Sequence, residues 1–107
     1  MELQKIIHRA LDLRRQYKVR ETALYGAPST SVDIARAFAG DVNNLVKLIE
    51  AVQGQRAIAN SREKLEAQLA HCLWSVLVIA QTHNVDIATA FMEAMDRLEA
   101  HLLETQE

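Results

Sequence analysis

The stretch KLEAQLAHCLWSVLVIA, residues 64–80, decides how this chain folds. With about 100° of rotation per residue, its apolar side chains cover nearly the whole circumference of a helix. A helix of this kind is buried on most of its sides by other helices. Four polar residues form one narrow stripe along it, at the spacing i, i+4, i+7 and i+11: Lys64, Gln68, His71 and Ser75. This stripe must face either water or a polar partner.

Three further helices are predicted around this one. Helix-breaking residues are scarce and occur in two places, at Gly26 with Pro28 and at Gly54. Between these breaks the apolar residues recur at helical spacing. The predicted helices span roughly residues 2–25, 31–53, 61–82 and 86–104. We therefore expect one all-α domain, a four-helix bundle that spans residues 1–107.

The expected helix starts have capping residues. Thr30 followed by Asp33, and Asn60 followed by Glu63, both match the spacing of a capping box, in which two side chains satisfy free N–H groups of the first turn. Asp86 can cap the last helix through its carboxylate.

Two features predict how the helices pack, within the chain and against a second copy of it. The connection at residues 81–85 is so short that we expect the last two helices to be antiparallel neighbours. Half of the residues are hydrophobic, although only five are aromatic, and a single small bundle cannot bury them all. We therefore expect an apolar face that is covered by a second copy of the chain, in a dimer or a tetramer.

Charge and composition exclude several classes of function. The formal net charge of −2 provides no general attraction to nucleic acid, so no nucleic-acid polymer is expected as a partner. A single cysteine, Cys72, cannot form an intrachain disulfide, which suits a reducing compartment. The N-terminus, MELQK at residues 1–5, is polar and unlike a signal peptide. The apolar run at residues 72–80 is far shorter than the ~20 residues of a membrane span, so we expect a soluble, cytoplasmic protein.

The polar stripe has a candidate partner on the predicted second helix. Asp41 lies at the margin of that helix's apolar face, and Asn44 follows three residues later on the same side. The sequence thus offers two i, i+3 polar pairs on facing helices, because Gln68 and His71 have the same spacing. Bundle cores build metal sites from such pairs, but the pairs can also hydrogen-bond to each other and fix the register of the bundle. Spacing alone leaves both interpretations open.

At these residues the sequence resembles a known family, and the resemblance covers nearly the whole chain. The most specific parts are CLWSVLV at residues 72–78 and the turn at Val85 and Asp86. The other matching stretches are MELQ at 1–4, RRQY at 14–17, YG at 25–26, FAGDVNNLVKL at 38–48, KLEAQLAHCLWSVL at 64–77, NVDI at 84–87 and AFMEAMD at 90–96. In these stretches the chain resembles the MazG-like branch of the all-α nucleoside triphosphate pyrophosphohydrolases.

The resemblance implies an activity and a cofactor. Family members hydrolyse a nucleoside triphosphate between its α and β phosphates, which gives a monophosphate and pyrophosphate. They use Mg²⁺ held by two acidic pairs on neighbouring helices, and the ion neutralises the phosphates and activates water. The corresponding positions in this sequence are Asp41, Asn44, Gln68 and His71.

Three of these four positions depart from the family pattern. Asp41 keeps its acid, whereas Asn44, Gln68 and His71 replace acids, so the cradle has a charge of about −1 in place of −4. Amide oxygens do not balance the charge of a cation, and imidazole favours Zn²⁺ or Ni²⁺ over Mg²⁺. The cofactor is therefore weakly held Mg²⁺, a transition metal or none.

Other polar residues near the cradle are candidates for contact with a substrate. Lys47 and Lys64 lie near the polar pairs and are candidates for contact with phosphates, although Lys47 falls on the solvent face of its helix; Ser75 is a third candidate. The predicted first helix contains six of the twelve basic residues, which form either a patch that steers phosphates or a solvated helix face.

Three hypotheses about function follow. The first is a divergent nucleotide pyrophosphohydrolase with an altered metal site, in which acids such as Glu66 or Asp96 replace the missing ligands. The second is a catalytically silent protein that binds a nucleotide or another small ligand. The third is a structural, homo-oligomeric helical protein that keeps only the bundle.

Overall fold

The computed structural model describes residues 2–105 of the chain. Within this range the chain forms four helices and no strand. The helices are α1 (Leu3–Tyr25), α2 (Ser31–Val52), α3 (Ser61–Thr82) and α4 (Ile87–Glu104). The predicted all-α class is confirmed, and the predicted helix ends agree with the observed ones to within a residue.

The starts of α2 and α4 have the predicted caps. The backbone N–H of Asp33 donates to Thr30 Oγ1 at 3.2 Å, and the N–H of Thr30 donates to Asp33 Oδ2 at 2.9 Å. These two bonds form a complete capping box. At α4, the N–H of Thr89 donates to Asp86 Oδ1 at 3.1 Å.

The start of α3 differs from the prediction. Asn60 was expected to form a capping box with Glu63, but its side chain makes no capping hydrogen bond. Asn60 has φ of 54°, in the left-handed region, whereas a capping residue normally has an extended backbone that directs its side chain to the first turn. Asparagine tolerates the left-handed conformation better than most residues. Asn60 therefore serves to turn the chain into α3.

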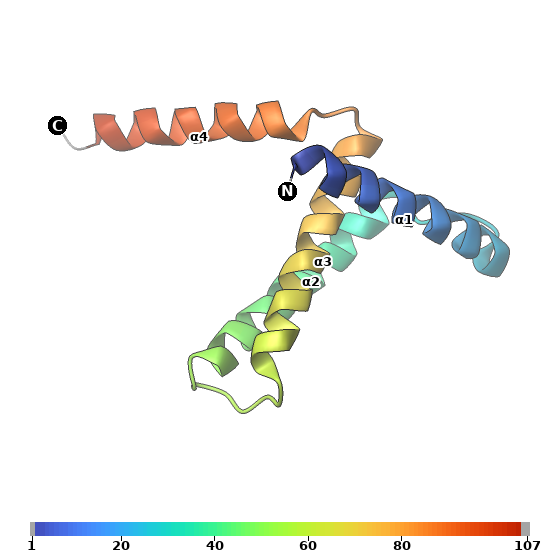
Figure 1. Ribbon diagram of the computed structural model, residues 1–107, viewed down its shortest axis with the longest axis horizontal. Coiled ribbons are helices and arrows are strands. Elements are labelled where there is room, and N and C mark those ends of the chain that lie inside the picture. Colours follow the sequence, from blue (N-terminus) through green and yellow to red (C-terminus); the bar gives the residue numbers. More distant parts are fainter. Residues whose placement is uncertain (1, 106–107) are drawn as a thin grey trace.

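Helices α2 and α3 form an antiparallel hairpin, as Figure 1 shows. Buried side chains come from both helices, with Ile34 on α2 and Leu77 and Val78 on α3 among them. Ser31 Oγ and His83 Nε2 lie 2.9 Å apart and join the open end of the hairpin. This hairpin is the packed centre of the chain.

Helix α1 crosses α3 near the open end of the hairpin (Figure 1). The indole N–H of Trp74 donates to the backbone carbonyl of Ala10 at 3.1 Å, and Ala10 itself is buried. The aromatic residue in the middle of α3 thus fixes the position of α1.

Helix α4 does not fold back along α3, which corrects the predicted antiparallel turn. It extends away from the end of the hairpin, on the side opposite to α1 (Figure 1). Asn84 has φ of 55°, and the N–H of Val85 donates to the carbonyl of Ala80 at 2.8 Å. A short connection limits only the distance between two helix ends, whereas this left-handed residue sets the direction in which the chain leaves.

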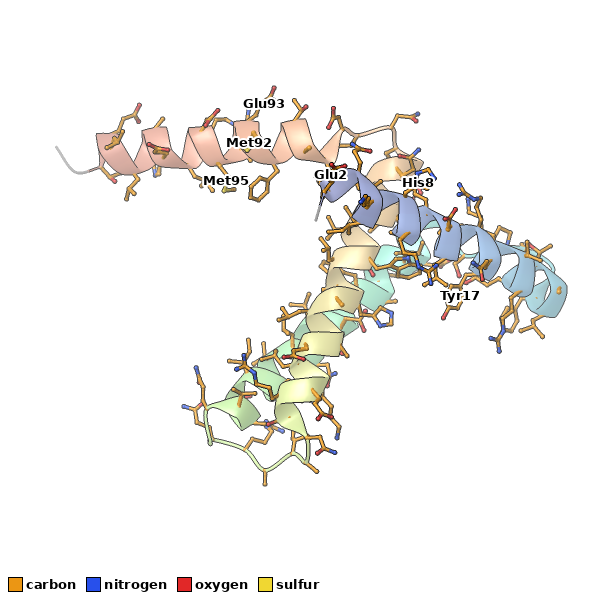
Figure 2. All side chains as sticks on the ribbon, in the orientation of Figure 1. Glu2, His8, Tyr17, Met92, Glu93 and Met95 are labelled. Atoms are coloured by element: carbon orange, nitrogen blue, oxygen red, sulfur yellow. The ribbon has the colours of Figure 1, made fainter. Side chains whose placement is uncertain are left out.

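The single chain is therefore extended. Its Cα radius of gyration is 17.1 Å, whereas a compact chain of this length has about 13 Å. Phe91, Leu98 and Leu102 of α4 are more than half exposed. Figure 2 shows Met92 and Met95 on the same helix without a neighbouring helix beside them. The prediction that one chain leaves apolar surface uncovered is confirmed.

Of the helices within residues 2–105, none is both long enough and apolar enough to cross a bilayer.

Candidate functional site

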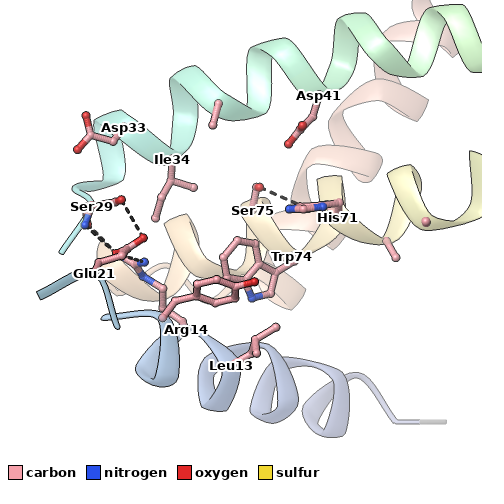
Figure 3. Close-up of a pocket in the computed structure, with 14 residues that line it drawn as sticks. Leu13, Arg14, Glu21, Ser29, Asp33, Ile34, Asp41, His71, Trp74 and Ser75 are labelled. Carbon is pink, nitrogen blue, oxygen red and sulfur yellow. Dashed lines mark hydrogen bonds and ion pairs between the residues drawn. The ribbon is translucent and has the colours of Figure 1, made fainter. Parts of the chain in front are cut away.

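A cavity of about 480 Å³, called the cleft below, lies where α1 meets the α2–α3 hairpin (Figure 3). Its walls come from three helices and from the connection between α1 and α2. It is lined by Leu13, Arg14, Tyr17, Glu21, Ser29, Asp33, Ile34, Ala37, Asp41, Ala67, Ala70, His71, Trp74 and Ser75. The volume is within the range of small-molecule sites in proteins, which is about 300–1,000 Å³.

One wall of the cleft is an ion pair between Arg14, which is buried, and Glu21, which is half-buried. Arg14 is only 5% exposed. Its Nη1 donates to Glu21 Oε1 at 3.1 Å, and its Nη2 donates to the carbonyl of Ser29 at 2.7 Å. The N–H and the hydroxyl of Ser29 donate to the two oxygens of Glu21, at 2.9 and 3.0 Å. These bonds tie α1 to the connection that precedes α2.

The hydrogen bonds at Glu21 also determine its charge. The backbone N–H of Ser29 is the main cause that lowers the pKa of Glu21, and the Ser29 hydroxyl and Arg14 contribute further. Glu21 is therefore ionised at neutral pH and neutralises Arg14. The guanidinium in the cleft is already paired.

A second wall is aromatic. The ring centroids of Trp74 and Tyr17 lie 5.9 Å apart, and the His71 ring meets Trp74 edge-on at the same distance. Edge-on and tilted contacts are the preferred geometries of aromatic pairs. The indole of Trp74 is held by its hydrogen bond to Ala10. This wall provides a rigid surface on which a flat ring can pack.

The cleft has an acidic balance. Asp33 and Asp41 line it together with the Arg14–Glu21 pair. The backbone N–H of Thr30 lowers the pKa of Asp33, so this carboxylate is also ionised. A polyphosphate placed in the cleft would meet carboxylates and a cation that is already paired. The cleft therefore favours a neutral or cationic ring over a phosphate group.

A smaller cavity of about 380 Å³, called the side pocket below, adjoins the cleft at His71. It is lined by Asn44, Leu48, Ile58, Lys64, Ala67, Gln68 and His71. Asn44 Nδ2 donates to Gln68 Oε1 at 2.8 Å, so the amides on α2 and α3 bond directly to each other. Of the two interpretations that spacing left open, this bond matches the one in which polar pairs fix the helix register.

The four predicted metal-site positions do lie on facing helices, but the structure divides them between the two cavities. Asp41 lines the cleft, Asn44 and Gln68 line the side pocket, and His71 lines both. Ser75, a predicted substrate contact, is buried in the cleft, and its hydroxyl donates to the carbonyl of His71 at 3.3 Å.

Of the other two predicted substrate contacts and the two alternative acids, only Lys64 lines one of these two cavities. Lys64 lines the side pocket, whereas Lys47 is exposed and lines neither cavity. Glu66 is exposed and lies 3.9 Å from Arg62, and Asp96 is exposed on α4. Neither of these acids is placed by the single chain to replace a missing ligand.

The donor set at the four positions does not fit Mg²⁺. Hard cations require several anionic oxygens, and only Asp41 of the four residues has one. The amide oxygen of Gln68 accepts a hydrogen bond from Asn44. Among residues 2–105, no three His, Cys, Asp or Glu side chains are grouped in a way that could hold a metal ion.

The aromatic wall and the ion pair were not among the predicted site residues. Arg14 was grouped with the other basic residues of the first helix, as part of a phosphate patch or a solvated face. The remaining five, Lys5, Arg9, Arg15, Lys18 and Arg20, are exposed as a solvated face requires, but Arg14 is buried. A signal was available: Ala10, Arg14, Tyr17 and Glu21 have the same i, i+4, i+7, i+11 spacing as the stripe on α3.

The chain was compared with protein-family models, with curated proteins and with solved structures, and none of these comparisons returned a match.

Proposed function

We propose that this chain is a MazG-like helical protein that binds a nucleotide-type ligand in the cleft but does not hydrolyse it through Mg²⁺. The observation on which this rests is the hydrogen bond between Asn44 and Gln68. These residues stand where the resemblance places two carboxylates, and their amides are bonded to each other. The charge that a magnesium-dependent hydrolase needs is missing from the cradle.

Several features of the cleft support retained binding. The aromatic wall of Trp74 and Tyr17 offers a surface for a base, since flat rings pack well on aromatic side chains. Asp41 on the opposite side can accept hydrogen bonds from the amino groups of a base. The Arg14–Glu21 pair holds the wall from α1 in place.

The same proposal includes a homo-oligomer. The apolar stripe of α4 and the uncovered apolar residues of the hairpin need a partner, and a second copy of the chain provides a surface of matching composition. An oligomer also restores a bundle around α4, which the single chain does not form.

The central experiment restores the acids of the family pattern. The triple variant Asn44→Asp, Gln68→Glu and His71→Asp surrounds Asp41 with three further carboxylates. Pyrophosphate release is measured for the parent and the variant, with each canonical ribonucleoside and deoxyribonucleoside triphosphate and millimolar Mg²⁺. We expect no release from the parent, and measurable release from the variant if the cleft still orients a triphosphate.

Stability and binding are measured in parallel. The added carboxylates repel each other, so the variant should be less stable than the parent without metal and should regain stability with Mg²⁺. Calorimetry of the parent should detect no Mg²⁺ binding in the low micromolar range. If the parent binds a transition metal, His71→Ala should weaken that binding more than Gln68→Ala.

Two results would overturn the proposal. Magnesium-dependent pyrophosphate release by the parent would show a divergent hydrolase whose ligands lie elsewhere, with Glu66 and Asp96 as the first residues to test. The absence of any nucleoside or nucleotide binding by the parent, measured by calorimetry, would leave only the structural role.

A further inference from the structure

Asp41 is a half-buried carboxylate that has no counter-charge in the cleft. None of the ion pairs formed within residues 2–105 includes it. Of the described residues that line the cleft, Arg14 alone is a permanent cation, and its guanidinium is bound to Glu21 and to the carbonyl of Ser29. The negative charge of Asp41 is therefore available to a cation that enters the cleft.

Asp33 adds a second negative charge to the lining of the cleft. One of its oxygens accepts the N–H of Thr30, and this bond is the main cause that lowers the pKa of Asp33, with the charge of Arg36 as a lesser cause. Asp33 is exposed, whereas Asp41 is half-buried. Asp33 thus strengthens the attraction for a cation, and Asp41 is the group that can hold it.

The wall on the other side of the cleft is aromatic. Figure 3 shows Asp41 on α2 and Trp74 on α3, with the cleft between them. Tyr17 is tilted by 53° and His71 by 77° against the indole, so the three rings form a corner and not a flat stack. The face of an aromatic ring attracts a cation, and an indole does so most strongly. A cation between this corner and Asp41 is attracted from both sides.

The rest of the lining determines which kind of cation fits. The other residues of the hairpin and of α1 that face the cleft include several apolar or small ones, namely Leu13, Ile34, Ala37, Ala67 and Ala70. Such walls cannot replace the hydration shell of an inorganic ion, and they offer no acceptors for the N–H groups of a primary amine. A quaternary ammonium group has no N–H, and its alkyl substituents can pack on apolar and aromatic side chains.

We propose that the cleft binds a small quaternary ammonium compound, with its positive nitrogen between Asp41 and the rings of Trp74 and Tyr17. This binding mode needs neither the base nor the phosphate of a nucleotide, so it goes beyond the proposed function. Both ligands use the same aromatic wall, and the cation and a nucleoside should therefore exclude each other.

The test compares choline with its neutral isostere, the alcohol in which a carbon atom replaces the charged nitrogen. In calorimetry, the contacts with the rings and with Asp41 should make choline bind about 10- to 100-fold more tightly than the isostere. Asp41→Asn keeps the shape of the side chain and should reduce the affinity for choline about tenfold, without a change for the isostere. Asp12→Asn is the matched control, because it removes an exposed carboxylate of α1 that does not line the cleft.

Fluorescence provides a second measurement at the aromatic wall itself. Trp74 is the only tryptophan of the chain, so its emission reports directly on the cleft. Choline should change this emission in a saturable way, whereas sodium chloride at the same concentration should not, because sodium keeps its hydration shell. Both this measurement and the comparison of choline with its isostere use the parent protein, so they decide the question even if Asp41→Asn fails to fold.

The outcomes separate the cation site from the proposed function. Equal binding of choline and its isostere, or an equal response of Trp74 to choline and to sodium chloride, overturns the cation site and leaves the proposed function intact. Choline binding without any nucleoside or nucleotide binding supports the cation site and overturns the proposed function. Equal losses in Asp41→Asn and Asp12→Asn, or simultaneous binding of choline and a nucleoside, would place the cation outside the cleft and overturn the proposed site.

Discussion

The three-helix part of the chain and helix α4 are both helical, but their surroundings differ. Within α1, α2 and α3, Arg14 and a small set of apolar side chains that includes Ile34 and Val78 are buried, although other apolar residues of these helices stay exposed. In α4, residues that recur on one helix face are between 39% and 61% exposed, namely Phe91, Met95, Leu98 and Leu102. Both regions are helical, so the difference lies in tertiary packing rather than in propensity.

This contrast indicates which interactions the single chain can complete. Ion pairs, caps and aromatic contacts between α1, α2 and α3 are formed within one molecule. The face of α4 has the i, i+4, i+7, i+11 pattern of a helix that packs on a partner, and under the proposed homo-oligomer that partner is a second copy of the chain. The following predictions test whether α4 is the region of association and whether the other three helices form the stable unit.

The largest effect is expected from a charge on the exposed face of α4. Burial of a leucine contributes about 1.5–3 kcal/mol, and a symmetric dimer loses that contribution twice. Leu98→Asp should therefore weaken self-association on the order of a hundredfold or more. In sedimentation at micromolar concentration, the parent should be at least a dimer, and the variant should approach the 12.0 kDa monomer.

Ala100→Asp is the matched control for this substitution. It adds the same charge two residues away, on the opposite face of α4, and should leave the association unchanged. An unchanged oligomer in Leu98→Asp would show that this face is not the interface, and a parent that sediments as a monomer would remove the proposed homo-oligomer.

The next effect concerns the stable unit and compares two adjacent arginines. Arg14→Met leaves the half-buried carboxylate of Glu21 and the carbonyl of Ser29 without their donor, which should cost about 1–3 kcal/mol of unfolding free energy. Arg15→Met removes an exposed pair with Asp12 and should cost less than about 1 kcal/mol. Urea unfolding of both variants measures the difference. Similar losses in the two variants would mean that the Arg14 network does not hold α1 to the hairpin.

The pH dependence of stability should report on the same ion pair through the protonation of Glu21. The pKa of Glu21 is lowered in the folded chain, mainly by the N–H of Ser29. Because its pKa is lower in the folded chain, ionised Glu21 stabilises the fold at every pH above the pKa of the unfolded chain, about 4.3. This contribution to stability is lost as the pH falls below about 4.3 and through the pKa of the folded chain. Glu21→Gln should be less stable than the parent at pH 7, and its stability should decline less between about pH 5 and pH 3.

Asp33 and Asp86 also have a lowered pKa, caused first by backbone N–H groups of their capping contacts, so some acid sensitivity should remain in Glu21→Gln. If the parent and Glu21→Gln have parallel stability curves across this range, the Glu21 network does not contribute to folding in the way proposed.

The sequence predicted the parts of the fold that depend on local chemistry. The breaks at Gly26 and Gly54 and the caps at Thr30 and Asp86 fixed the helix ends. These signals act within one or two turns of the chain, so one sequence is enough to detect them. Asn60 was the exception, because its left-handed backbone depends on the path of the preceding loop and not on residue type alone.

The sequence could not predict the direction of α4 or the composition of the cleft. The direction of α4 follows from the single left-handed residue Asn84, which no periodicity reveals. The cleft depends on how α1 crosses α3, a tertiary property that the hydrogen bond from Trp74 to Ala10 fixes. The facing polar pairs were placed correctly on α2 and α3, but spacing did not determine that Asn44 and Gln68 would bond to each other.

The smallest expected effect tests whether α4 is independent of the stable unit. Asp86→Ala removes the carboxylate that accepts the N–H of Thr89, and loss of such a cap typically costs about 1 kcal/mol. In the monomeric background of Leu98→Asp, this cost should fall on α4 alone, because α4 extends away from the other three helices (Figure 1). Hydrogen exchange should then become faster for the amides of α4 and stay unchanged for the buried turns of α3 around Val78.

Thr30→Ala removes the equivalent cap from α2, which is packed in the hairpin, and should instead lower the protection of α2 and α3 together. If Asp86→Ala lowers the protection of all four helices equally, the chain unfolds as one cooperative unit and the distinction between α4 and the other helices fails.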